Sequence, residues 1–353
     1  MFRRSQQDKP RFPGIVWLAI LGCFLNFGDL RAQDTTNFPT IGHVERFEAE
    51  LDGIVAPDAR IEVLASGFEW SEGPVWIPEQ GNPFDGYLLF SDIPRNSVIK
   101  WQEGVGASVF LKPSGFTGPG NYGREPGSNG LALDQHKRLI FCEHGDRRLS
   151  LLTPGGGKIT LADQWQGKRF NSPNDLAVRN NGDIFFTDPI YGLPQHEKDP
   201  LREIDFCGVY RIEPNGTVTL QCQTISRPNG IAFTPDHQTL YVANSDGKDP
   251  IWRAFPVLSD GNLGEPRAFF DSSKEKRISA GGGDGLKVDT VGNVFATGPG
   301  GVLVLSPDGQ LLGRIVTGER ISNVAWGNEG SVLYLTSDMY LCRIRTLTRG
   351  KVP

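Results

Sequence analysis

The segment NGIAFTPDHQTLYVANSD, residues 229–246, decides the fold because its pattern recurs along the chain. A polar residue followed by glycine opens it, and a short apolar strand, a turn and a second β-rich run complete it. Five similar segments begin at Glu72, Asn129, Asn174, Asp284 and Ser322. Successive segments start 38 to 57 residues apart, which is the range of β-propeller blade repeats. The sequence therefore predicts six repeating units.

Each segment is followed by a further pair of strands. Examples are GVYRIEPNGTVTL from Gly208 and GVLVLSPDGQLLGRIV from Gly301, in which Asn-Gly or Asp-Gly separates two alternating runs. Such dipeptides between alternating runs are strong hairpin signals. Four strands in each of six units predict an all-β, six-bladed propeller. Residues 36–64 precede the first unit, and we expect them to supply an outer strand that closes the ring.

Composition excludes one class of partner and supports the fold class. The chain of 353 residues has a net charge of −5, and no cluster of lysine and arginine stands out. A nucleic-acid surface needs such a cluster, so we expect no nucleic-acid partner. The 44 glycines and 25 prolines are suited to many tight turns between short strands. We expect a monomer or a weak dimer.

The amino terminus has the layout of a secretory signal peptide. Arg3 and Arg4 precede an apolar run over residues 15–27, and a polar segment ends at Ala32. The run is short for a membrane span. We expect residues 1–32 to be the signal peptide and 33–353 the propeller, in a secreted or periplasmic protein without stable membrane association after cleavage. A retained anchor at residues 15–27 and lipid attachment at Cys23 are the alternatives.

Export permits disulfides, and one pair of cysteines is suitably spaced. A hairpin turn centred on Pro214 and Asn215 would place Cys207 and Cys222 opposite one another. A disulfide and two buried free thiols are both compatible with this spacing. No cysteine or histidine spacing suggests a zinc site.

The first residues of the six segments form a candidate site. The innermost strand of each propeller blade runs along the central channel, so the residues just before these strands form a ring at its mouth. Asn and Asp are also common turn residues, so any one of them could be structural. As a set, the carboxylate and amide oxygens favour a hard cation in a central-channel metal site. We expect Ca²⁺ first, with Mg²⁺, Mn²⁺ or Zn²⁺ as alternatives.

Several motifs together resemble the SMP-30/gluconolactonase family of six-bladed propellers, which is related to the calcium-dependent phosphotriesterases of the diisopropylfluorophosphatase type. They are EGPVW, RFNSPNDLAV, FTDPIYG, RPNGIAFTPD, YVAN and GDGLKVD, within residues 60–345. The resemblance implies a divalent metal in the channel, with the ligands Glu72, Asn174, Asn229 and Asp284. Family members with the mammalian-type site carry an arginine two residues before the P-N-D asparagine, where this chain has Ser172.

The resemblance also implies the reaction. We expect hydrolysis of a lactone, such as the sugar lactone glucono-1,5-lactone, by water attacking a metal-polarised carbonyl with Asp284 as general base. A nucleophilic Asp284 is the competing role. Another lactone, another ester or an organophosphate could be the substrate, and a non-catalytic propeller that binds a sugar or a protein is the alternative from a different class.

Further residues are candidates for substrate binding. His144 and Arg147 share the loop after an inner repeat strand, and Tyr191 lies in a long Pro-rich connection. We expect these three residues to contact the substrate together with Asn129 and Asn174. The chain has no G-x-S-x-G or H-E-x-x-H motif, so neither a serine hydrolase nor a zincin is supported.

Overall fold

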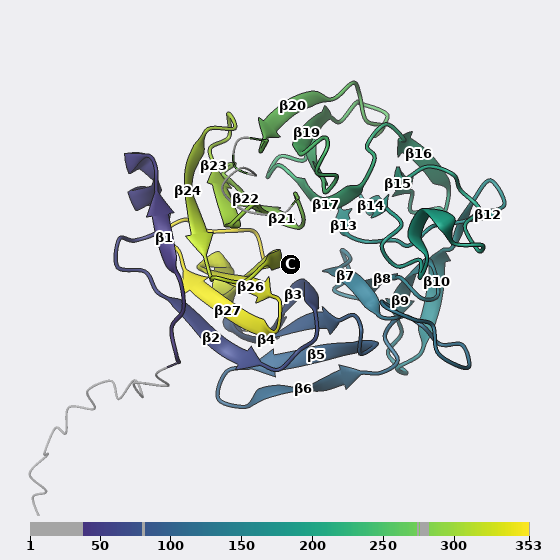
Figure 1. Ribbon diagram of the computed structural model, residues 1–353, viewed down its shortest axis with the longest axis horizontal. Helices are drawn as coiled ribbons and strands as arrows, with labels where there is room; N and C mark the ends of the chain where they lie inside the picture. Colours follow the sequence, from purple (N-terminus) through teal and green to yellow (C-terminus); the bar gives the residue numbers. More distant parts are fainter. Residues whose placement is uncertain (1–37, 80–81, 274, 276–281, 353) are drawn as a thin grey trace, which may run out of the picture. The chain divides into compact units, whose positions relative to one another are not determined.

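The computed structural model describes residues 38–352, except 80–81, 274 and 276–281. The predicted signal peptide lies outside the described residues. Within them, six sheets surround a central channel, with β3, β7, β13, β17 and β21 among the innermost strands (Figure 1). The described part contains the short 3₁₀ segments Ala49–Gly53, His196–Lys198 and Asn328–Gly330. The predicted all-β, six-bladed propeller is confirmed.

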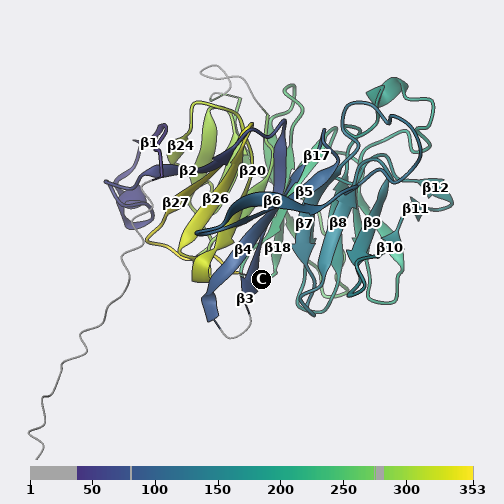
Figure 2. The same cartoon turned by 90° about the horizontal axis from the view of Figure 1, so that it is seen from below.

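Each blade contains four consecutive antiparallel strands, except where the chain closes the ring. Blade 1 contains β3 (Ser71–Glu79), β4 (Asn82–Asp92), β5 (Ser97–Gln102) and β6 (Gly106–Leu111). Blade 2 contains β7 (Ser128–Leu133), β8 (Leu139–Glu143), β9 (Arg148–Leu152) and β10 (Lys158–Ala162). Blade 3 contains β13 (Leu176–Val178), β14 (Ile184–Asp188), β15 (Gly208–Ile212) and β16 (Val218–Cys222). Figure 2 shows β7 to β10 side by side in this order.

The remaining blades follow the same scheme. Blade 4 contains β17 (Pro228–Phe233), β18 (Thr239–Asn244), β19 (Ile251–Pro256) and β20 (Arg267–Asp271). Blade 5 contains β21 (Leu286–Val288), β22 (Val294–Gly298), β23 (Gly301–Leu305) and β24 (Leu311–Val316). Blade 6 contains β25 (Ile321–Gly327), β26 (Val332–Ser337) and β27 (Tyr340–Arg345). A small ribbon of β11 (Gln164–Trp165) and β12 (Lys168–Arg169) precedes blade 3.

The amino-terminal part of the propeller closes the ring, as the sequence predicts for residues 36–64. Strand β2 (Ile61–Ser66) pairs antiparallel with β27, with Ile61 opposite Ile344, and so becomes the outer strand of blade 6. Strand β1 (His43–Arg46) adds a fifth strand to blade 5 by pairing with β24. The last blade is therefore built from both ends of the domain, which ties its first and last strands together.

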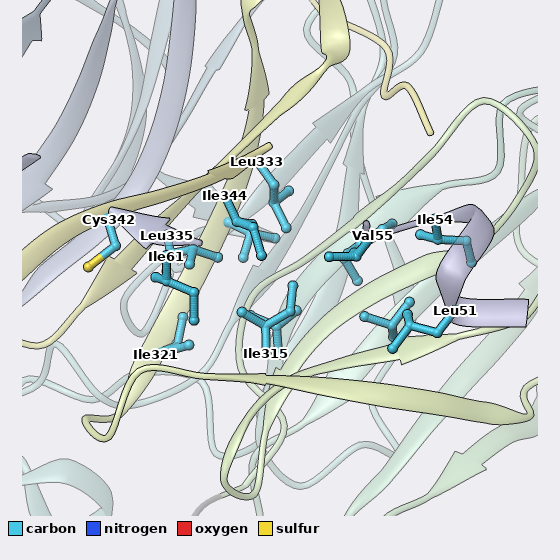
Figure 3. Packing of buried hydrophobic residues seen from close by; sticks show 14 of the residues in the cluster. Leu51, Ile54, Val55, Ile61, Ile315, Ile321, Leu333, Leu335, Cys342 and Ile344 are labelled. Atoms are coloured by element: carbon cyan, nitrogen blue, oxygen red, sulfur yellow. The ribbon is translucent and has the colours of Figure 1, made fainter. Parts of the chain in front are cut away.

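The core is divided among the interfaces between blades. A separate cluster of buried apolar side chains fills each of the six junctions between neighbouring blades. At the junction of blades 5 and 6, Leu51, Ile54 and Val55 lie close to Ile315 and Ile344 (Figure 3). The segment before β2 thus adds apolar side chains to the junction where the ring closes.

The two cysteines that could form a disulfide are free thiols. In the β15–β16 hairpin Tyr210 faces Leu220, and a bulge then places Cys222 opposite Val209. Cys207 precedes β15 and packs with Ile190 and Leu193. The bulge and a slightly later turn centre are the reasons why the predicted opposition of Cys207 and Cys222 does not occur. No helix among the described residues is long and apolar enough to cross a membrane.

Candidate functional site in the central channel

The ring residues converge because the inner strands of neighbouring blades approach closely. A Cβ atom on Gly230 would lie 2.2 Å from the backbone oxygen of Asp284 in the next blade. A Cβ atom on Gly285 would lie 2.1 Å from the side chain of Asn323. Only glycine allows such contacts, so packing requires the glycine that follows a ring residue in four of the six segments.

Hydroxyl side chains at the ends of the second strands fix the ring backbone. Ser91 Oγ donates to the backbone oxygen of Asn129 at 2.8 Å, and Thr187 Oγ1 donates to that of Asn229 at 2.7 Å. In the same way, Thr297 Oγ1 donates to the backbone oxygen of Ser322 at 2.9 Å, so each of these bonds runs from one blade to the ring residue of the next. These bonds hold neighbouring ring positions at fixed separations.

A cavity of about 510 Å³ occupies the channel beside the ring. It is lined by six residues that the sequence analysis singled out: Glu72, Asn129, Asn174, Tyr191, Asn229 and Asp284. Trp70, Glu125, Ser245 and Arg320 also line it and were not predicted. The structure thus brings together the four expected metal ligands and three of the expected substrate contacts, Asn174 being counted in both sets.

The carboxylates in this cavity are crowded. Burial, followed by the negative charge of Asp284, raises the pKa of Glu72 above its usual range. Burial, followed by the charge of Asp175, raises the pKa of Asp284 to about 7, while the guanidinium of Arg320 acts in the opposite direction. The ionised carboxylates therefore lack sufficient positive charge nearby, which a bound cation would supply.

Two residues in the channel were missed by the sequence analysis. Asp175 and Asn323 occupy the position that is glycine in the other four segments. Asn323 Nδ2 lies 3.3 Å from Asp175 Oδ2 and 3.2 Å from Glu72 Oε2, so one amide holds two carboxylates. A comparison of the second residue of each segment would have identified this pair, because the glycines leave room for them to meet.

Ser322 does not line the cavity, although its position in the repeat predicts this. Its hydroxyl donates to the backbone oxygen of Ser71 at 2.6 Å, which links blade 6 to blade 1. The pairing of β25 with β26 is irregular between Ile321 and Asn323. Ser322 therefore has a structural role, and Asn323 is the blade 6 side chain that reaches the channel carboxylates.

Arg147 lies apart from the cavity, in contrast to the expectation from its loop. Its buried guanidinium donates to the backbone oxygens of Phe170 and Leu201, each at 2.7 Å. The hydrogen-bonding capacity of the side chain is thus used to hold two later loops of the chain in place. The cavity instead contains Arg320, which lies over the ring of Trp70 with 5.9 Å between the guanidinium carbon and the ring centre.

His144 and Tyr191 occupy different depths. His144 is fully buried behind the cavity wall, and its Nε2 lies 3.4 Å from Asn129 Nδ2. Tyr191 lines the cavity directly, and its hydroxyl is 2.6 Å from Ser245 Oγ. Burial raises the pKa of Tyr191 to about 12, so the phenol stays protonated at neutral pH.

The donor set fits a divalent cation with hard oxygen ligands. Asp284 Oδ1 is buried and has no hydrogen-bond partner among the described residues. Glu72, Asn174 and Asn229 add further oxygens from three other blades. Within the described ranges no three carboxylate, imidazole or thiol groups form a metal-binding cluster, so an ion here needs the amide oxygens as ligands.

Known proteins are similar to this chain in both sequence and fold. A gluconolactonase from Zymomonas mobilis is 39% identical over 328 residues, which cover 90% of each chain. The structure of a gluconolactonase from Xanthomonas campestris matches with a TM-score of 0.73 and 31% identity, over 87% of this chain and 97% of that one. A regucalcin structure from Agrobacterium tumefaciens, at 19% identity and a TM-score of 0.64 over 89% and 97% of the two chains, shares the fold.

The match to the family extends over all six blades. The sequence model of the SMP-30/Gluconolactonase/LRE-like region matches residues 70–339. This range begins just before the first ring residue and ends within blade 6. The chain belongs to the SMP-30/gluconolactonase/LRE-like family.

Proposed function

We propose that the protein hydrolyses a lactone, specifically a sugar lactone such as glucono-1,5-lactone, to the corresponding hydroxy acid in the channel cavity. The observation that carries the proposal is the carboxylate of Asp284, whose Oδ1 is buried in a polar cavity without a hydrogen-bond partner among the described residues. The similarity to the Zymomonas gluconolactonase, which extends over 90% of both chains, supports the choice of substrate class.

Glu72, Asn174, Asn229 and Asp284 would hold a divalent ion, for which Ca²⁺ is the first choice because carboxylate and amide oxygens suit it. When bound, such an ion supplies Lewis acidity that polarises an ester carbonyl. Asn323 keeps Glu72 in place through its bond to Oε2, and Gly73 donates its backbone N–H to the same oxygen at 2.8 Å. Glu72 is therefore oriented before any ligand arrives.

Asp284 acts as the general base. Its Oδ1 takes a proton from a water molecule as the water oxygen bonds to the lactone carbonyl carbon. The bond between this carbon and the ring oxygen then breaks, and Asp284 returns the proton to the departing ring oxygen, which becomes a hydroxyl group. The ring opens to a hydroxy acid, and Asp284 is regenerated.

The polar lining is suited to a substrate with several hydroxyl groups. Asn129, Asn174 and Ser245 offer amide and hydroxyl groups, and Tyr191 offers a protonated phenol. A site built from hydrogen-bonding groups discriminates against analogues that lack the matching hydroxyls, because its buried polar groups are then left unpaired. A polyhydroxylated lactone therefore fits this cavity better than an apolar ester.

The test is a substrate panel with metal depletion. Glucono-1,5-lactone, a simple ester and a phosphotriester are assayed by proton release, with the spontaneous rate subtracted, before and after chelation and restoration of Ca²⁺, Mg²⁺, Mn²⁺ or Zn²⁺. We expect the lactone to be the best substrate, with activity lost on chelation and restored by one of the ions. Activity that survives complete chelation would refute the metal requirement. A folded protein that hydrolyses no lactone would refute the proposed lactonase activity.

We also propose that the protein is exported and that residues 1–32 are removed, because basic residues precede the apolar run at residues 15–27. Amino-terminal sequencing of the protein from its native host tests this proposal. A mature chain that begins near residue 33 is the expected result, and a chain that begins at Met1 would contradict it.

A further inference from the structure

Three side chains form a line of contacts in the cavity wall. Glu125 Oε2 lies 3.3 Å from Nδ1 of His144, and Nε2 of the same imidazole lies 3.4 Å from Nδ2 of Asn129. His144 is fully buried, whereas Glu125 and Asn129 line the cavity. The imidazole thus joins two cavity residues that come from different segments of the chain.

The chemistry of this line determines where the protons lie. A carboxylate only accepts hydrogen bonds, so Nδ1 facing Glu125 carries the hydrogen. The alignment at Nδ1 falls short of a good hydrogen bond, but Nδ1 has no other partner in the described part of the chain. In a neutral imidazole, Nε2 is then a hydrogen-bond acceptor. The amino group of Asn129 can donate to it, whereas the amide oxygen of Asn129 cannot.

The orientation of the Asn129 amide follows from this tautomer. With Nδ2 turned toward His144, Oδ1 must lie on the opposite side of the amide. Asn129 Oδ1 is buried and has no hydrogen-bond partner among the described residues. With the other tautomer, the Nε2–H of His144 would donate to the Asn129 oxygen, and the Asn129 amino group would face the cavity instead. One proton position therefore decides whether this part of the wall accepts or donates hydrogen bonds.

We propose that Glu125 and His144 are positioning residues that fix the Asn129 amide with its oxygen toward the cavity, where it accepts a hydrogen bond from a hydroxyl group of the lactone. The identity of the ligand rests on the function proposed above, but the orientation of the amide does not. This arrangement selects substrates that carry a hydroxyl group at this point and disfavours those that present an acceptor there.

The tautomer is tested by NMR on the full propeller. Long-range ¹H–¹⁵N spectra distinguish protonated from unprotonated imidazole nitrogens, and the variant His144→Gln identifies the signals of His144 among the five histidines. We expect a protonated Nδ1 and an unprotonated Nε2 in the wild type, and loss of this pattern in Glu125→Ala. A protonated Nε2 in the wild type, alone or in an imidazolium, would overturn the proposal.

The effect on recognition is tested by a double-mutant cycle with glucono-1,5-lactone. Loss of one hydrogen bond to substrate predicts a KM raised on the order of 10-fold in Asn129→Ala, with kcat nearly unchanged. Glu125→Ala should raise KM similarly, but should add nothing in the Asn129→Ala background. Glu265→Ala, which removes an exposed carboxylate elsewhere, is the matched control. Equal effects of Glu125→Ala in both backgrounds would show that it acts by charge and not through Asn129.

Failure of the proposed function is distinguishable from failure of this inference. If the wild type hydrolyses no lactone, the tautomer measurement still decides the orientation of the amide. If the wild type is active but calorimetry shows that Asn129→Ala weakens Ca²⁺ binding without changing KM, the oxygen serves the metal and the assignment to a substrate hydroxyl is wrong.

Discussion

The variant Gly230→Ala should damage both the fold and the site, because the added methyl group has no room. Its Cβ atom would lie 2.2 Å from the backbone oxygen of Asp284, whereas an ordinary contact is 3.4 Å or longer. The two inner strands must therefore separate by about 1.2 Å at this point. The strain falls on the residue that we propose as the general base.

The magnitude follows from this displacement. Overpacking of this kind costs about 1 to 3 kcal/mol of unfolding free energy. In a domain of this size that cost lowers Tm by about 2 to 5 °C. A displacement of about 1 Å at a catalytic group lowers kcat by about 100-fold. We therefore expect a moderately destabilised protein with a severe loss of lactonase activity.

The assay compares Gly230→Ala with Gly155→Ala by thermal unfolding and by lactone hydrolysis. A Cβ atom on Gly155 would meet nothing within 4 Å, and the backbone there is not in the left-handed region. The control should keep the Tm and kcat of the wild type. Equal Tm and kcat values for the two variants would refute the claim that this glycine positions Asp284.

Three further predictions concern stability. Burial raises the pKa of Asp188 from 3.8 to about 7, so near pH 5 to 6 the native state holds a proton that the unfolded state releases. The free energy of unfolding should therefore fall by up to about 4 kcal/mol between pH 4 and pH 7. Urea unfolding at these two pH values should show a much smaller change for Asp188→Asn. Asn323→Ala removes the donor shared by Glu72 and Asp175 and should cost about 3 kcal/mol without divalent ions, whereas an unchanged urea midpoint would contradict this role. Arg343→Leu removes a buried guanidinium that contacts Glu62 in β2 and the exposed Glu103 after β5, and it should cost about 3 kcal/mol by urea unfolding, against less than about 1 kcal/mol for the exposed Arg349→Leu. Equal losses would show that the closure between β2 and β27 does not depend on the Arg343–Glu62 pair.

Most of the fold was predictable because a propeller repeats one local pattern. The alternation of apolar residues and the Asn-Gly and Asp-Gly turns are local signals, and six copies reinforce one another. The β15–β16 register was predicted incorrectly, since a bulge shifts Cys222 opposite Val209 and no local signal marks it. The additional pairing of β1 with β24 is a long-range contact that the repeat pattern does not encode.

The site was predictable only where the ring position determines the side-chain direction. Glu72, Asn129, Asn174, Asn229 and Asp284 line one cavity because each lies at or just before the start of an inner strand. Loop residues were not predictable in this way. Arg147 is held by backbone oxygens of neighbouring loops, while Glu125 and Arg320 reach the cavity from connections whose course depends on tertiary packing.

The central claim is that the carboxylate of Asp284 performs proton transfer in a channel that also holds a divalent ion. The most direct measurement compares kcat/KM of Asp284→Asn with that of the wild type on glucono-1,5-lactone, at a Ca²⁺ concentration that calorimetry shows to saturate both proteins. Loss of a general base predicts a decrease of about 10²- to 10⁴-fold with the ion still bound. An ion-saturated Asp284→Asn variant that keeps the wild-type kcat/KM would contradict the claim.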